Sequence, residues 1–150
     1  MAMLAGVVVL AMLVGGCGGG GDEEESLTKA QYAKQGSKIC AKEGEKVGDD
    51  LTAYGKKHDL SEKVSKEETA KLIETVIFPG FEAELEGLRE LPPPEGEEEK
   101  VEAMLTQFEK GLDEGAEDPA SFFEIEKGEF EKATDAMDKY GVKGCGTLFL

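Results

Sequence analysis

Three cysteines and one histidine are the side chains of this sequence best suited to chemistry. Cys17, Cys40 and Cys145 lie far apart, and none belongs to a C-x-x-C motif of the kind used in thiol–disulfide exchange or zinc binding. His58 is the only histidine, which excludes any site that needs two imidazoles. We expect His58 at the surface near a helix end. The cysteines therefore offer the clearest chemistry, and their neighbours in sequence indicate what it is.

Cys17 follows an apolar segment typical of exported proteins. Residues 1–14, MAMLAGVVVLAMLV, carry no charge, and an apolar run of about 7–15 residues followed by small residues suits a signal peptide better than a membrane-spanning helix. The stretch VGGC, residues 14–17, resembles the lipobox of bacterial lipoproteins, whose cysteine is diacylated on sulfur and becomes the mature N-terminus. The resemblance implies that residues 1–16 are a signal peptide and that Cys17 is the lipid attachment site. The alternative is an uncleaved apolar helix with an ordinary thiol at Cys17.

Residues 17–27 read as a lipid anchor and flexible tether. The sequence GGGGDEEES is rich in glycine and acid and has nothing apolar to bury, so we expect a self-repelling coil with a reach of roughly 16–19 Å. Residues 28–150 form the predicted domain beyond it. A lipid-anchored protein of this kind would lie on the extracytoplasmic face of the cell membrane.

Export would carry Cys40 and Cys145 to an oxidising compartment, where a disulfide is expected. The segment from Tyr140 to Cys145 is just long enough to reach Cys40 if the last helix ends near the start of the first. The absence of C-x-x-C spacing and the apolar neighbours of Cys40 favour a structural bridge over a redox-active one. Such a bridge would fix the C-terminal tail, whose apolar end, Leu148–Leu150, either packs on the domain or serves as a docking patch.

The sequence is strongly acidic, with a formal net charge of −16. Nucleic acid and anionic lipid headgroups would be repelled, so neither is an expected partner. The acidic clusters DEEE, EGEEE and DEGAED lack the spacing of a calcium-binding loop. The motifs of phosphate-binding loops, haem attachment and serine hydrolases are also missing. We therefore predict no metal, no cofactor and no catalytic residue.

Hydrophobic spacing predicts an all-α, four-helix bundle-like domain. Capping boxes at Thr28 and Ser65 start the first two helices, and Pro79 is expected to kink or break the second near Phe78. The third helix is expected from about Glu97. The fourth is expected to open at Asp118 and Pro119, after a turn over GLDEGAEDPA, and to stop at Gly141. Its predicted buried side is Phe122, Phe123, Phe130, Ala133, Met137 and Tyr140.

The predicted domain also resembles the small lipoproteins that are numerous in actinobacteria. The stretches that carry the resemblance are LTKAQY (27–32), IC (39–40), LRELPPPEGEEE (88–99) and YGVKGCG (140–146). The resemblance implies a cell-surface location and a paired cysteine, and it brings no activity or ligand. We expect a non-enzymatic module that binds another envelope protein or a small ligand. The alternative is an extracytoplasmic enzyme or cation-binding protein that uses surface carboxylates.

Overall fold

A computed structural model describes residues 26–58, 64–124 and 128–147, and this part of the chain is all-α. Two short segments differ from α-helix: η1 is a π-helix and η2 is a 3-10 helix. The elements in chain order are α1 (Lys29–His58), α2 (Lys66–Leu72), η1 (Ile73–Ile77), α3 (Phe78–Arg89), α4 (Glu98–Glu117), η2 (Pro119–Glu124) and α5 (Glu129–Tyr140). None of the helices described here is both long enough and apolar enough to cross a bilayer.

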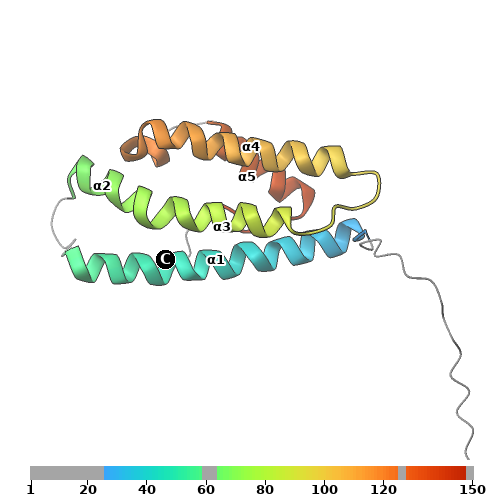
Figure 1. Cartoon of the computed structure of the whole chain (residues 1–150), viewed down its shortest axis with the longest axis horizontal. Coiled ribbons are helices and arrows are strands. Elements are labelled where there is room, and N and C mark those ends of the chain that lie inside the picture. The colour runs from blue at the N-terminus through green and yellow to red at the C-terminus, as the bar shows by residue number, and fades with distance from the viewer. Residues whose placement is uncertain (1–25, 59–63, 125–127, 148–150) are drawn as a thin grey trace, which may run out of the picture.

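The helices pack as a bundle in which α3 lies between α1 and α4 (Figure 1), and α5 packs mainly on α4. Phe81 of α3 is fully buried at the centre. Its ring lies 6.4 Å from that of Phe108 on α4 and 5.1 Å from that of Phe130 at the start of α5. Aromatic packing in the core therefore joins α3, α4 and α5, while α1 covers the other side of α3.

The predicted capping boxes both form. At the start of α1, the Gln31 amide oxygen accepts from the Thr28 N–H at 2.8 Å, and the Thr28 hydroxyl accepts from the Gln31 N–H at 3.3 Å. Ser65 and Glu68 make the same reciprocal pair before α2. These contacts satisfy N–H groups that a helix start leaves without intrahelical partners.

Pro79 is accommodated by a change in the helical hydrogen-bond pattern. The predicted second helix is divided into α2, η1 and α3, and the Phe78 N–H donates to the carbonyl of Ile73, five residues earlier. The wider π turn comes immediately before a proline that lacks an N–H of its own and would crowd the preceding turn of a regular helix. Phe78 itself keeps helical dihedral angles. The expected interruption is therefore a π-helical segment.

The predicted start of the fourth helix at Asp118 and Pro119 is wrong. Helix α4 continues to Glu117, the segment Pro119–Glu124 forms only a 3-10 helix, and α5 begins at Glu129. Gly111 lies within α4 and does not end it. It is buried at a helix contact, where a Cβ would meet the backbone of Phe130 at 2.4 Å. This glycine provides space for the close approach of α5. Phe123, which the prediction placed in the core, is 57% exposed.

Candidate functional site

The segment after α5 folds back onto α1 and carries Cys145 to Cys40. Gly141 ends α5 in the left-handed conformation, with φ of 116°, as its sequence position predicts. The next residue, Val142, is buried and packs beside Gly36 of α1, where an added Cβ would lie 3.0 Å from a Val142 methyl. The Lys143 N–H then donates to the Ser37 hydroxyl at 2.8 Å. These contacts direct residues 141–147 along α1.

Cys40 and Cys145 are joined in a disulfide, which is the pairing expected from the sequence. The two Cα atoms lie 4.7 Å apart, and the bridge links positions separated by 105 residues. Cys40 is fully buried on α1, and Cys145 is 5% exposed. The bridge therefore ties the end of the described chain to the first helix.

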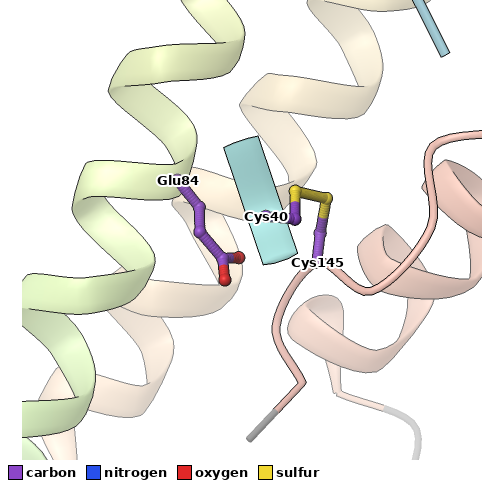
Figure 2. A group of neighbouring side chains, drawn as sticks. All are labelled: Cys40, Glu84 and Cys145. Atoms are coloured by element: carbon purple, nitrogen blue, oxygen red, sulfur yellow. A yellow bond between two sulfur atoms is a disulfide. The ribbon is translucent and has the colours of Figure 1, made fainter. Parts of the chain in front are cut away.

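A buried carboxyl group lies beside this disulfide. Figure 2 shows the Glu84 side chain extending from α3, with its carboxyl group on the side of the helix where the disulfide lies. A Glu84 carboxyl oxygen and both Sγ atoms all lie within 4.8 Å of one another. Glu84 is 0% exposed, and its Oε2 accepts from the Gly146 N–H at 2.8 Å. Its Oε1 has no hydrogen-bond partner among the residues that the structure describes.

Burial raises the pKa of Glu84 to about 8, because the charged form loses its hydration. The hydrogen bond from Gly146 opposes this effect, and the nearby charge of Glu43 adds to it. Glu43 lies one turn after Cys40 on α1, and its own pKa is lowered, chiefly by the hydrogen bond from Lys42. Glu84 is therefore mostly protonated at neutral pH, whereas Glu43 is ionised.

The Cys40, Glu84 and Cys145 cluster is not a metal site in this oxidised form. Cysteine binds a metal as the thiolate, and here the two sulfur atoms are bonded to each other. The carboxyl group alone falls short of the three protein ligands of a typical catalytic zinc site. What the cluster does combine is a reducible bond and a neutral carboxyl that can release a proton.

Sequence reasoning missed Glu84, although its position contained a signal. It lies three residues after Phe81 and four before Leu88, two buried members of an apolar stripe along α3. Residues at those spacings share a helix face, so the stripe itself places this carboxyl in the core. A single acid within an apolar stripe is thus a clue to a buried titratable group.

A small pocket lies where α4, η2 and the start of α5 meet. It has a volume of about 180 Å³ and is lined in part by Gly111, Gly115, Phe122, Phe123 and Phe130. Gly115 gives the Phe122 ring room, since a Cβ there would come within 2.2 Å of that ring. The exposed Phe123 packs edge-on against Phe122 at a centroid distance of 4.9 Å. An aromatic side chain thus borders an opening into the aromatic core.

The acidic residues of the described chain form no tight ligand cage. Glu82, Glu86 and Asp113 line a groove of about 490 Å³ between α3 and α4. In the same groove the Arg89 guanidinium donates to both carboxylate oxygens of Glu109, at 3.1 and 2.7 Å. The three acids are exposed, so their attraction for a cation is screened by solvent and salt.

Other residues singled out in the sequence are placed as follows. His58 is exposed at the end of α1, as expected, and its ring stacks on that of Tyr54 at 4.1 Å. The cluster EGEEE leads into α4, and Glu97, the residue before that helix, pairs with Lys29 and Lys100. Cys17 with its lipobox, the cluster DEEE and the apolar end Leu148–Leu150 lie outside the described residues. Comparison with protein-family models, curated proteins and solved structures finds no match to this chain.

Proposed function

We propose that this chain is a lipid-anchored protein of the extracytoplasmic face of the cell membrane, whose helical domain binds another envelope protein. The disulfide between Cys40 and Cys145 is the observation that carries the export part of this proposal, because disulfides persist mainly in oxidising compartments. The lipobox-like stretch before Cys17 supplies the anchor. The acidic tether between anchor and domain holds an anionic surface away from anionic headgroups.

The pocket beside Phe123 is the proposed contact surface, and its size favours a protein partner over a small ligand. Pockets for drug-sized ligands have volumes of about 300–1,000 Å³, whereas this one has about 180 Å³. One apolar side chain of a partner fits such a space. Phe123 would lie beside that side chain, and aromatic residues next to well-packed pockets often dominate binding energy at interfaces.

Replacing the proposed lipid attachment residue tests the location. Cys17→Ser should leave the helical domain folded and should abolish fatty-acid labelling and membrane retention, because the two acyl chains of the proposed anchor are attached at Cys17, ahead of the helical domain. Gly19→Ser in the same tether is the matched control and should keep both properties. Membrane retention by the Cys17→Ser protein would instead support the uncleaved apolar helix.

Site-specific photocrosslinking in cells tests the contact surface. A photoreactive phenylalanine analogue at position 123 should give a discrete crosslinked species, whereas the same analogue at the exposed position Thr52 on α1 should not. The partner identified in this way should then bind the purified protein, and Phe123→Ala should weaken that binding at least tenfold, a loss of about 1.4 kcal/mol. Equal crosslinking at both positions, or unchanged affinity, would contradict the pocket as the contact surface.

A further inference from the structure

The structure brings together three groups that the sequence separates: a disulfide, a buried carboxyl and a C-terminal segment that covers both. Cys40 comes from α1, Glu84 from α3 and Cys145 from the segment after α5. No hydrogen bond within the described residues engages Glu84 Oε1. A buried polar group without a partner costs stability, and an alternative apolar residue would fill the same place in the α3 stripe. The position of this carboxyl beside the sulfur atoms therefore points to a chemical role.

We propose that Cys40 and Cys145 form a reversible thiol–disulfide couple and that Glu84 is its proton donor and acceptor. The substrate class is a dithiol in the reductive direction and a disulfide in the oxidative direction. This inference depends neither on the lipid anchor nor on the pocket beside Phe123. The cysteine spacing in the sequence favoured a purely structural bridge. The proposal differs because the structure adds the Glu84 carboxyl, which the sequence analysis did not identify.

Reduction of the bridge takes two exchange steps. A thiolate of the external dithiol attacks Cys145 Sγ, the Cys40–Cys145 bond breaks, and its electron pair goes to Cys40 Sγ. Glu84 gives its proton to that sulfur, directly or through one water. The second thiol of the reductant then loses its proton to the Glu84 carboxylate and attacks its own mixed-disulfide sulfur. Cys145 leaves as a thiolate and takes a proton from water. The external dithiol becomes a disulfide, and the couple becomes two thiols.

The arrangement favours Cys145 as the attacked sulfur and Cys40 as the leaving group. Cys145 is 5% exposed and lies in the terminal segment, whereas Cys40 is fully buried on α1. Short non-helical segments open at lower free energy than packed helices. A thiolate released at Cys40 would be buried, and burial of an unpaired charge is costly. A proton from the adjacent carboxyl removes that charge as it forms.

The charges around Glu84 suit this role. From α1, ionised Glu43 acts on it, while Lys42 and Lys46 are paired with Glu43 at 3.0 and 3.7 Å. From the C-terminal segment, Gly146 contributes an N–H, and Cys145 contributes a sulfur. Burial and Glu43 raise the pKa of Glu84 to about 8. The carboxyl thus carries a transferable proton at neutral pH, and the Gly146 N–H can stabilise the carboxylate after transfer.

The rate of reduction by dithiothreitol tests this proposal. The protein is the full chain carrying Cys17→Ser, so that Cys40 and Cys145 are its only cysteines. Samples are quenched with a maleimide that shifts the gel mobility of free thiols, and rate constants are corrected for the thiolate fraction of dithiothreitol. The corrected rate should fall at least threefold as the pH rises from about 7 to about 9. Near neutral pH, Glu84→Gln should be at least tenfold slower than the parent, with no such pH dependence.

A purely structural bridge would show the opposite pH dependence. In that case ionisation of Glu84 loosens its surroundings and makes the disulfide easier to reach, so the corrected rate rises with pH. Observing such a rise would overturn the proposal. If Glu84 acts only by repelling the incoming thiolate, Glu84→Gln reacts as fast as the parent near neutral pH, which also overturns it. Glu84→Asp should restore part of the rate, and Glu82→Gln, an exposed change on the same helix, should leave the profile unchanged. If Glu84→Gln does not fold, a rise of the parent's corrected rate with pH still overturns the proposal.

Discussion

The pH dependence of stability provides a direct thermodynamic test of the buried Glu84. In the folded protein this carboxyl has a pKa of about 8, compared with 4.5 for an unperturbed glutamate. Between those values the folded state holds a proton that the unfolded state has lost. Stability must therefore fall as the pH rises through this window and become level above the folded pKa. This sign is opposite to that of a carboxylate stabilised by an ion pair.

The size of the effect follows from the difference between the folded and unfolded pKa values of Glu84. A tenfold difference in proton affinity corresponds to about 1.4 kcal/mol, so the whole window corresponds to an effect on the order of 5 kcal/mol. Domains of this size typically have about 5–15 kcal/mol of stability in total. The lowered pKa values of Glu43 and Glu109 do not mask this effect, because their contributions are lost only as the pH falls through the acid range.

Urea unfolding followed by circular dichroism, with the disulfide intact, measures this effect. The free energy of unfolding should fall by about 2.7 kcal/mol between about pH 5.5 and about pH 7.5. Glu84→Gln should abolish most of that difference, because the amide has the shape of the protonated acid and does not ionise. Glu82→Gln, an exposed change on the same helix, should retain it. If the free energy of unfolding depends on pH equally in Glu84→Gln and in the parent, the raised pKa assigned to Glu84 is refuted.

Helix packing and the bridge each give a further prediction. Gly111→Ala should destabilise the domain by about 2 kcal/mol, because the added Cβ would meet the backbone of Phe130. Gly55→Ala should instead stabilise it by about 0.5–1 kcal/mol, because a Cβ at that helical position would meet nothing within 4 Å. Urea midpoints of the two variants check this contrast, and equal shifts would contradict it. Replacing Cys40 and Cys145 by serine should cost up to about 4.7 kcal/mol of stability. It should also expose residues 145–147 to protease before the helices, as mass spectrometry of the first cleavage products would show. Initial cleavage within a helix would count against this order.

Local chemistry explains why much of the fold could be predicted. The capping boxes at Thr28 and Ser65, the break before Pro79 and the stop at Gly141 each depend on a few neighbouring residues. Such signals act through backbone hydrogen bonds and dihedral angles within one helical turn. They were readable without knowledge of the packing, and the all-α class followed from them and from the hydrophobic spacing.

The errors arose where tertiary packing overrides a local preference. Glycines in the stretch GLDEGAEDPA predicted a turn, but Gly111 and Gly115 lie in α4 because Phe130 and Phe122 occupy the space that their side chains would fill. A glycine at a helix contact and a glycine in a turn are identical in sequence. The exposure of Phe123 follows from the continuation of α4, because the 3-10 helix η2 then takes the place of the first turns of the predicted fourth helix.

The C-terminal segment is held by contacts that differ in their response to conditions, and this difference gives it a defined order of release. Val142 packs on α1 beside Gly36, and the Lys143 N–H bonds Ser37; neither contact depends on a redox or acid–base group. The bridge at Cys145 responds to reductant, and the bond from Gly146 ends on a carboxyl that responds to pH. Because the responsive contacts come after the unresponsive ones along the chain, reduction should free the segment from Cys145 onward while Val142 stays in place. The helices contact one another directly through the pairs α1–α3, α3–α4 and α4–α5, so they would remain assembled while the buried sulfur of Cys40 becomes accessible.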